Sequence, residues 1–309
     1  MVLVSGVPQG SILGPILFNI FINDLVYFIK SDLGNFADDN TISDAAKTIP
    51  DLIKSLENES NQMIVNPDKF QAIILSRNSS DQGTYTLKFD NNEILTSPEV
   101  ILLGIEIDNK LNFIKHIHQL VKRAGGQLNY LIRNKKFLNY DGKKVVIESF
   151  ILANFNYCPL VWHFCSSVAM KKLERIQERT FRFLLEDYDS DYDQLLTKLN
   201  KPTLEIRRLR LLATEIFKTI NNLNAPYMKE VFKLNTRRAE TGSERLVVQG
   251  QISKKYGSYT LRSLGPKIWN KLPSDIKHSK NLVVFKNMIK SWSGPKCHCG
   301  SCKYLGICS

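Results

Sequence analysis

The chain has 309 residues, enough for two domains or so, and its hydrophobic content of 43% is sufficient for ordinary buried cores. It contains 42 Lys and Arg against 30 Asp and Glu, and the net charge of +12 favours a polyanionic partner, nucleic acid before a membrane. No secretory signal peptide is recognisable at Met1. The isolated Cys158 and Cys165 are predicted to be reduced, which favours an intracellular protein, nuclear or cytoplasmic, over a secreted one.

The first segment is predicted to be a loop that leads into an apolar helix. Two glycines and a proline within residues 5–11 enforce the loop, and Ser11 can cap the helix that follows. Residues 12–29 carry apolar side chains at helical spacing, and the polar residues among them exclude a membrane span. A glycine-bearing loop before a helix can approach an anionic ligand closely, but an ordinary capped core helix has the same pattern.

Two adjacent carboxylates, Asp38 and Asp39, follow the apolar run at residues 33–36. Gly34 and Asn35 just before them indicate a strand, a tight turn and a second strand, with the acids at the tip. Two acids repel each other there, and a bound magnesium ion would account for them because it takes oxygen ligands. A solvated turn is the alternative, since Asp and Asn are common in turns.

The next segments are predicted to form one helix and several short strands. Residues 48–65 have a helical apolar face, and residues 71–76 read as a strand. Residues 85–89 and 94–96 read as short strands, and residues 100–108 as a strand pair in which Gly104 allows close backbone approach.

A basic helix is predicted over residues 113–133, with its apolar residues on one side. From Lys115 to Lys144 the chain has eight Lys or Arg and only one acid, Asp141. These basic residues can follow a phosphate backbone, while the aromatic residues between them can stack on bases or simply pack; a solvated basic face is the alternative. The candidate nucleic-acid-binding residues are Lys115, Lys122, Arg123, Arg133, Lys135 and Lys136.

Three more helices are predicted downstream. Residues 145–164 form a long apolar helix kinked at Pro159, with Cys158 and Cys165 as reduced core residues. Residues 169–185 form a basic amphipathic helix, and residues 187–193 an acidic loop. Residues 204–223 form a third helix, and the arginines near its start oppose the helix dipole, which hints at a binding role for Arg207, Arg208 and Arg210.

The last part of the chain differs in composition from the helical segments before it. Residues 236–263 are polar and indicate a loop, and residues 264–273 lead into residues 285–292 with a small aromatic cluster under a loop. Four thiols close the chain, enough for a zinc site. Their tight C-x-C spacing leaves loose reduced cysteines as the alternative. They are Cys297, Cys299, Cys302 and Cys308.

The string GVPQGSILGPILFNIFINDL, followed by FADD at residues 36–39, resembles the reverse transcriptases of non-LTR (LINE-type) retrotransposons, most closely the jockey-like elements. The resemblance implies a loop, Pro8, Gln9 and Gly10, that lies against the incoming nucleotide and the template. It also implies that Asp38 and Asp39 are catalytic carboxylates that bind Mg.

Two further stretches extend the resemblance. Residues 65–70, VNPDKF, are similar to the element whose lysine, here Lys69, contacts phosphate and protonates the leaving pyrophosphate. Residues 100–108 are similar to the hairpin that grips the primer, and this assigns Leu103, in place of the usual aromatic residue, and Gly104 to the primer grip.

The resemblance implies an α+β fold with three parts. Residues 1–108 would be a partial polymerase palm, a small antiparallel sheet with helices. Residues 109–225 would be a helical, thumb-like region that binds nucleic acid, and residues 226–309 an irregular C-terminal extension with the Cys-rich tail. The implied activity is RNA-directed DNA polymerisation by two-metal phosphoryl transfer, with an RNA template, a DNA primer and deoxynucleoside triphosphates as partners.

One essential aspartate of the family lies upstream of the PQG loop, and here only residues 1–4 precede that loop. We therefore expect an N-terminally truncated protein with an incomplete Mg site that is inactive alone. The open sheet edge also predicts marginal stability for residues 1–108 in isolation. The alternative function is a non-enzymatic nucleic-acid-binding remnant that uses the basic helical region.

Overall fold

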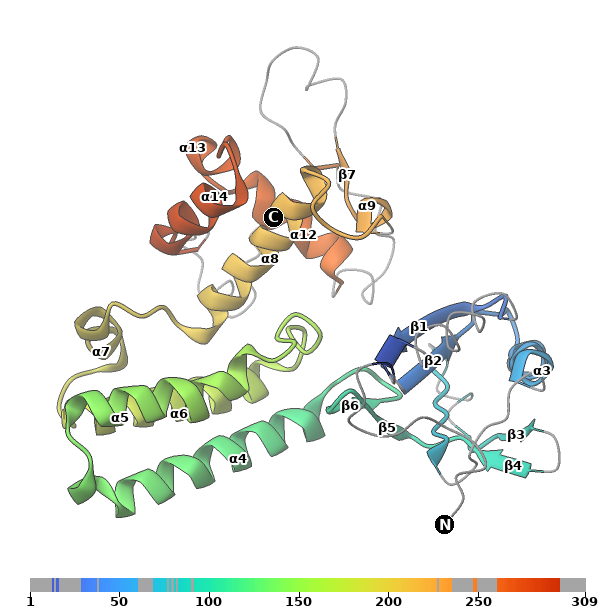
Figure 1. Cartoon of the computed structure of the whole chain (residues 1–309), viewed down its shortest axis with the longest axis horizontal. Helices are drawn as coiled ribbons and strands as arrows, with labels where there is room; N and C mark the ends of the chain where they lie inside the picture. Colours follow the sequence, from blue (N-terminus) through green and yellow to red (C-terminus); the bar gives the residue numbers. More distant parts are fainter. Residues whose placement is uncertain are drawn as a thin grey trace. The chain divides into compact units, whose positions relative to one another are not determined.

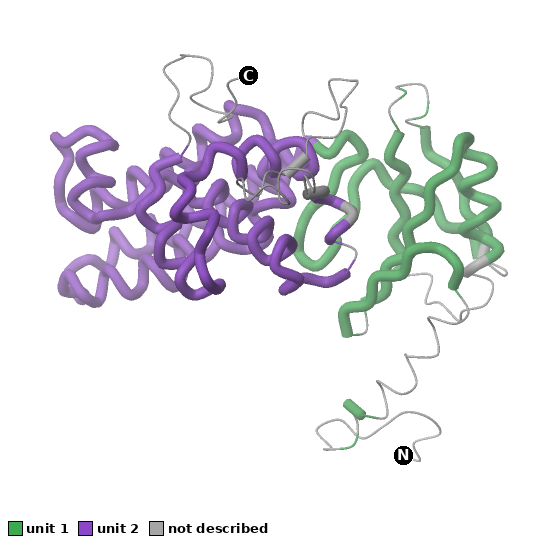
Figure 2. Tube along the Cα trace, turned by 90° about the horizontal axis from the view of Figure 1, so that it is seen from above, with its two compact units in different colours: residues 1–111 green, residues 112–309 purple. Residues whose placement is uncertain are grey.

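The computed structural model describes residues 13, 15–16, 29–37, 39–60, 69–76, 78, 81, 83–89, 92–226, 228–234, 247–248 and 260–294. The chain divides into two compact units, Met1–Leu111 and Asn112–Ser309 (Figure 2). Among the described residues the fold is mostly helical, and the strands pair only in two-stranded antiparallel sheets. The predicted α+β class is confirmed at this level. The predicted helix at residues 12–29 lies almost wholly outside the described residues.

The first unit contains three β-hairpins and one described helix (Figure 1). The strand pairs are β1 (Asp32–Phe36) with β2 (Asp39–Ser43), β3 (Thr86–Phe89) with β4 (Asn92–Leu95), and β5 (Glu99–Leu102) with β6 (Ile105–Asp108). The helix is α3 (Ile49–Ser60). The hairpins confirm the strand, turn and strand predicted around the acidic residues, the short strands predicted at residues 85–89 and 94–96, and the strand pair predicted at residues 100–108.

A small core holds β3, β4 and α3 together. Leu87 and Ile94 are buried, with side chains from α3 and from the segment before β3 against them. Residues 71–76 do not form the predicted strand: they contribute a single parallel bridge, Ala72 to Thr96. The reason is that the neighbouring strands already pair within their own hairpins, and the Gln71 side chain accepts the Ile101 N–H instead (2.9 Å).

The second unit begins with three helical passes. Helix α4 (Ile114–Arg133) leads through η3 (Lys135–Phe137) to α5 (Tyr140–Val146), η4 (Ile147–Ile151) and η5 (Leu152–Asn156), which return along α4. Helix α6 (Ser167–Leu185) then packs on α4. The predicted apolar face of α4 is confirmed, since Ile117, Ala124 and Leu128 are fully buried.

The predicted long helix over residues 145–164 is wrong. The α-helix ends at Val146, a π-helical turn and a 3-10 turn follow, and the chain then turns sharply before α6. Cys158 has a φ of 42°, and a residue before proline disfavours the α conformation, so the helix cannot continue through Pro159. Cys165 is buried as predicted, whereas Cys158 is exposed and is not a core residue.

The remaining helices of the described residues are α7 (Tyr192–Leu199), α8 (Leu204–Ile220), α9 (Met228–Val231), α12 (Leu261–Asn270), α13 (Ser274–Lys277), α14 (Leu282–Met288) and η6 (Ile289–Ser291), with a short pair of β7 (Lys233–Leu234) and β8 (Val247–Val248). The acidic loop predicted over residues 187–193 gives way to α7 at Tyr192. The helix begins there because Asp191 and Gln194 form a reciprocal capping box.

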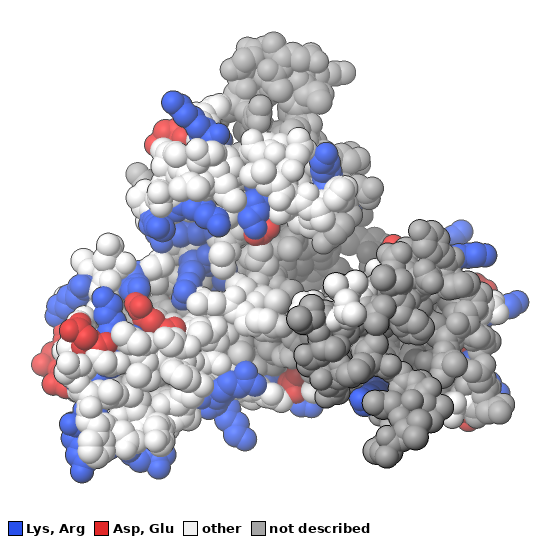
Figure 3. Space-filling view, viewed as in Figure 1, with Lys and Arg blue, Asp and Glu red and all other residues white. Residues whose placement is uncertain are grey.

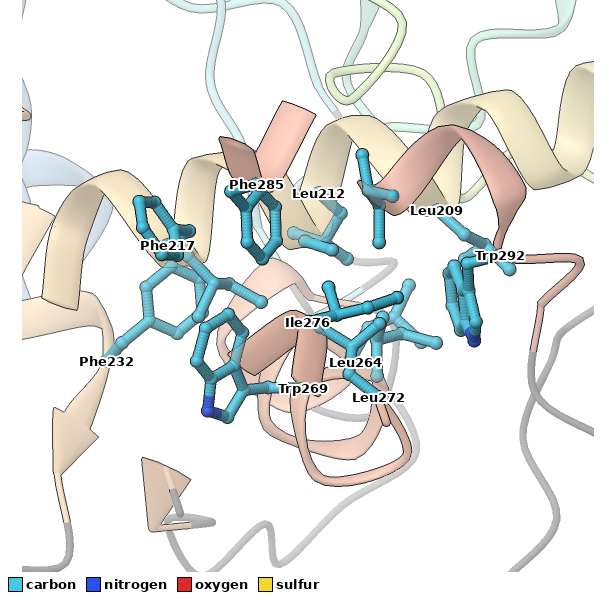
Figure 4. Close-up of a cluster of buried hydrophobic side chains, with 14 residues drawn as sticks. Leu209, Leu212, Phe217, Phe232, Leu264, Trp269, Leu272, Ile276, Phe285 and Trp292 are labelled. Carbon is cyan, nitrogen blue, oxygen red and sulfur yellow. The ribbon is translucent and has the colours of Figure 1, made fainter. Parts of the chain in front are cut away.

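The predicted aromatic cluster is confirmed, but it packs on α8 rather than only under a loop (Figure 4). The ring of Phe285 stacks on Phe217 of α8 at 4.3 Å between centroids, and Trp269 lies 6.2 Å from Phe285. The apolar face of α8 is therefore covered by α12 and α14, which ties the C-terminal helices into the core of this unit.

Candidate nucleic-acid interface

The outer face of α4 and η3 is strongly basic. All six residues predicted to bind nucleic acid are exposed, and α4 contains no acidic residue over its 20 positions. In Figure 3, Lys and Arg side chains project along the lower edge of the view, where α4 lies. Because no acid of its own neutralises this face, it can attract a polyanion. The six residues are Lys115, Lys122, Arg123, Arg133, Lys135 and Lys136.

Aromatic side chains lie exposed on the same stretch. Tyr130 and Phe137 expose 69% and 72% of their surface, and Tyr140 exposes 48%. The Lys136 ammonium lies 4.9 Å from the centroid of the Phe137 ring. Since these rings are not packed into the core, they are free to stack on nucleotide bases, one of the two alternatives that the sequence left open.

Lys143 differs from its basic neighbours. Its side chain is buried and its Nζ lies 2.6 Å from Glu186 Oε1. The same Nζ lies 5.3 Å from the centroid of the Phe183 ring. Lys143 is therefore a structural residue that links α5 to the end of α6, and it does not belong to the basic face.

Two of the three arginines near the start of α8, Arg208 and Arg210, are held by contacts within the helical unit. Arg208 is only 3% exposed; it lies over the Trp162 ring at 5.3 Å and its Nη2 is 2.9 Å from Met170 Sδ. Arg210 donates a hydrogen bond from Nε to the Trp292 carbonyl at 2.8 Å. The predicted binding role is thus wrong for Arg208, because burial within the helical unit removes it from any ligand.

A buried histidine lies beside Arg208. The exposed fraction of His163 is 7%, and its ring packs edge-on against Phe164 at 5.1 Å between centroids. Burial, together with the Arg208 charge, lowers the pKa of His163 to about 3. His163 is therefore neutral at physiological pH and serves the core rather than the basic face.

The β1–β2 hairpin places Asp39 at the start of β2. Asp39 is exposed and pairs with Phe36 across the strands, while Asp38 lies outside the described residues. Ala37 has a φ of 53°, in the left-handed region that costs a non-glycine residue about 1 kcal/mol. Lys69 is also exposed, and within the described residues no hydrogen bond or ion pair joins it to Asp39.

The predicted primer-grip residues occupy the turn between β5 and β6. Leu103 and Gly104 both have positive φ, 48° and 78°, as a two-residue hairpin turn of the I′ kind requires. A Cβ at Gly104 would meet nothing within 4 Å, so the space beside the backbone is open. Whether a ligand strand approaches this turn stays a prediction.

The remaining predicted site residues lie outside the described part of the chain. This holds for Pro8, Gln9 and Gly10, and for the cysteines at residues 297–308, so the zinc site stays a prediction. Over the residues that the structure describes, no three His, Cys, Asp or Glu side chains gather as a metal site. In that same part of the chain, no helix is both long and apolar enough to cross a membrane.

Comparison with curated proteins shows which known sequences this chain is similar to. A probable RNA-directed DNA polymerase from transposon BS of Drosophila melanogaster is 24% identical over 205 residues, covering 60% of this chain and 23% of that relative. A probable RNA-directed DNA polymerase from transposon X-element of the same organism is 22% identical over 196 residues, covering 58% of this chain and 22% of that relative.

The RNA-directed DNA polymerase from mobile element jockey, also of Drosophila melanogaster, is 22% identical over 201 residues, covering 58% of this chain and 22% of the relative. This chain is similar to RNA-directed DNA polymerases of mobile elements. The resemblance seen in the PQG and FADD motifs is therefore confirmed, at low identity. The chain spans less than a quarter of the length of these relatives. No protein-family model and no solved structure matches it.

Proposed function

We propose that the chain is a segment of an RNA-directed DNA polymerase of a non-LTR retrotransposon, and that its helical unit binds nucleic acid through the outer face of α4 and η3. The observation that carries this proposal is the exposure of all six predicted basic residues, four on α4, which contains no acid, and two on the adjoining η3. Because the relatives are named RNA-directed DNA polymerases, an RNA template and a DNA primer are the polyanions that we expect this face to bind.

The chemistry of this face suits a nucleic-acid backbone. Lys and Arg that neutralise phosphates release condensed counterions, and the exposed rings of Tyr130 and Phe137 supply stacking surfaces. Phosphate contacts position a strand without reading its sequence. We therefore propose binding that is strong at low salt and largely independent of base sequence.

The test is a fluorescence-anisotropy titration of the full chain against a labelled RNA strand, a DNA strand and an RNA–DNA duplex over a salt series. Replacing Lys122 and Arg123 by Gln should lower the slope of log K against log salt by about 1.4 for a strand and about 1.8 for a duplex. An affinity that does not change with salt would contradict the proposal.

A second function, polymerase catalysis, is favoured by the strained turn at the acidic hairpin. Backbone strain persists where the surrounding structure requires it, and such positions cluster at functional sites. In this proposal Asp39, together with Asp38, holds Mg, whose oxygen preference matches carboxylates. The metal would neutralise phosphate charge when bound, Lys69 would contact phosphate, and the Leu103–Gly104 turn would support the primer.

Primer extension with Mg and deoxynucleoside triphosphates tests this second function. Incorporation that disappears in both Asp38→Asn and Asp39→Asn would assign catalysis to the hairpin. A chain that binds nucleic acid with unchanged affinity in both variants, but extends no primer, would leave nucleic-acid binding as its function.

A further inference from the structure

Helix α6 carries a basic row that faces α4. Lys172, Arg175 and Arg179 follow one another at spacings of three and four residues, so they lie on one stripe of the helix. Contacts between the helices show where this stripe lies: Lys172 Nζ is 2.8 Å from His118 Nε2, and an Arg179 nitrogen is 3.3 Å from Asn129 Oδ1. We call the line along which this stripe of α6 meets His118 and Asn129 of α4 the α4/α6 seam.

The two helices run parallel along the seam. The early residues His118 and Lys172 meet, and the later residues Asn129 and Arg179 meet. Parallel helices bring both N-termini to the same end, so their partial positive charges add there. On α4 the stripe of His118 and Asn129 also includes Lys122, which is exposed.

Neutral groups orient these cations without cancelling their charge. An ammonium has only donors, so the His118 nitrogen is the acceptor of the hydrogen bond from Lys172. The partner of Arg179 is an amide oxygen, which is also uncharged. Each contact holds a long side chain in place, which lowers the entropy lost on binding an anion.

The acids of α6 point away from the seam. Glu174 accepts hydrogen bonds from the Tyr192 hydroxyl and from the backbone at the start of α8. Glu178 forms its ion pair with Arg182 at 2.7 Å. Within the described part of the chain, neither carboxylate therefore neutralises the basic stripe, and helix α4 has none to offer.

Of two neighbouring glycines on α4, Gly126 leaves the backbone beside the seam open, whereas Gly125 packs against α6. A Cβ at Gly125 would lie 3.6 Å from Ile176, in ordinary contact, and one at Gly126 would meet nothing within 4 Å. A ligand can thus come close to the backbone of α4 between the flanking cations. The stretch from His118 to Asn129 extends about 16 Å along the helix, which matches about five phosphates of one strand of a duplex.

We propose that the α4/α6 seam binds the phosphodiester backbone of a nucleic acid through Lys122, Lys172, Arg175 and Arg179. This inference rests on the proposed nucleic-acid-binding function and extends it to a second helix, which the sequence predicted to be basic but whose side chains were not among the candidate binding residues. The four proposed binding residues are all cationic and none of them is aromatic, so the seam positions the strand and does not read bases.

The test compares charge-neutralised variants of the full chain by anisotropy with a labelled RNA strand, a DNA strand and an RNA–DNA duplex. Arg175 is the sharpest probe because it is exposed and, within the described part of the chain, its side chain forms no hydrogen bond or ion pair whose loss could disturb folding. Arg175→Gln should lower the slope of log K against log salt by about 0.7 for a strand and about 0.9 for a duplex. The triple variant Lys172→Gln, Arg175→Gln, Arg179→Gln should lose about tenfold or more in affinity at low salt.

The matched control removes three exposed lysines from the region of α14: Lys280→Gln, Lys286→Gln and Lys290→Gln. It changes the net charge equally and should leave the slope unchanged. A wild-type slope in the α6 variants, with a reduced slope in the Lys122→Gln, Arg123→Gln pair, would overturn the seam while the proposed function stands. No binding by the wild-type chain would overturn both.

Poly-glutamate serves as the alternative polyanion in the same assay. Binding of the acidic polymer as tight as that of nucleic acid, and equally weakened in the α6 variants, would overturn the nucleic-acid assignment in favour of an acidic protein partner. Weaker binding of the polymer at equal charge supports the seam as a phosphate-binding surface.

Discussion

The Glu174 carboxylate accepts a hydrogen bond from the Tyr192 hydroxyl at 2.6 Å, and this contact joins α6 to α7. The same carboxylate accepts the backbone N–H groups of Leu204 and Glu205, at 3.2 and 3.0 Å, and so caps the start of α8. Burial, with the nearby Glu174 charge, raises the pKa of Tyr192 well above its ordinary value, which keeps the hydroxyl a donor. One side chain thus ties three helices together.

Glu174→Gln should therefore destabilise the second unit by about 1–3 kcal/mol, because an amide cannot replace a charged acceptor for all three donors. Glu178→Gln is the control, since its part-exposed pair with Arg182 is worth only about 0.5 kcal/mol. All three tryptophans, Trp162, Trp269 and Trp292, lie in this unit, so urea unfolding followed by tryptophan fluorescence measures both variants. Equal effects would contradict the role given to Glu174.

Two helical glycines should respond oppositely to alanine. A Cβ at Gly265 would clash with the Phe232 ring and lie 3.2 Å from Ile216 Cδ1, so Gly265→Ala should destabilise the unit by about 1–3 kcal/mol. Gly126 has open space, and Gly126→Ala should stabilise α4 by about 0.5–1 kcal/mol. The same fluorescence assay reports both. A stabilising Gly265→Ala would show that the Gly265 site can relax, and a destabilising Gly126→Ala would contradict the open space beside Gly126.

The buried His163 should make the second unit sensitive to acid. Its pKa is about 3 in the folded state against 6.5 for an unburied histidine, so below about pH 6.5 the unfolded chain binds a proton that the folded chain does not. The contribution of His163 to stability is complete above that pH and falls as the pH drops toward 3. By pH 4.5, about two units below the pKa of the unfolded chain, the loss should reach about 2.7 kcal/mol.

His163→Phe removes the titrating group while keeping an aromatic ring in the core. Its unfolding free energy should depend less on pH between 4.5 and 7 than that of the wild-type chain. Urea unfolding at several pH values gives this comparison directly. An unchanged pH dependence would show that other groups cause the acid sensitivity.

Lys143 should behave unlike the exposed lysines. Because its ammonium is buried against Glu186 and the Phe183 ring, Lys143→Met should leave nucleic-acid affinity and its salt slope unchanged. Glu186→Gln should destabilise the unit, since it leaves a buried charge without its partner. Anisotropy and urea unfolding measure the two effects. A salt slope lowered as much as in Lys122→Gln would place Lys143 on the binding face after all.

Local patterns in the sequence were enough to predict several elements. Alternating and turn-forming residues around Gly34 and Gly104 predicted the hairpins, and the apolar spacing over residues 113–133 predicted α4. The motifs at residues 6–25 and 36–39 were enough to detect the similarity to RNA-directed DNA polymerases of mobile elements. These features are determined by residues that lie close to one another in the chain, so they can be recognised from the sequence alone.

The tertiary structure alone decided which charges are available. In the sequence, Lys143 and Arg208 cannot be distinguished from the exposed basic residues. In the structure both are buried, Lys143 against Glu186 and Arg208 against Trp162. Lys172 lies 54 positions from His118, and only the parallel packing of α4 and α6 joins their stripes into one seam. Helical periodicity tells which residues share a face, but the partner of that face is set by packing between distant segments, and this is where the candidate binding surface is defined.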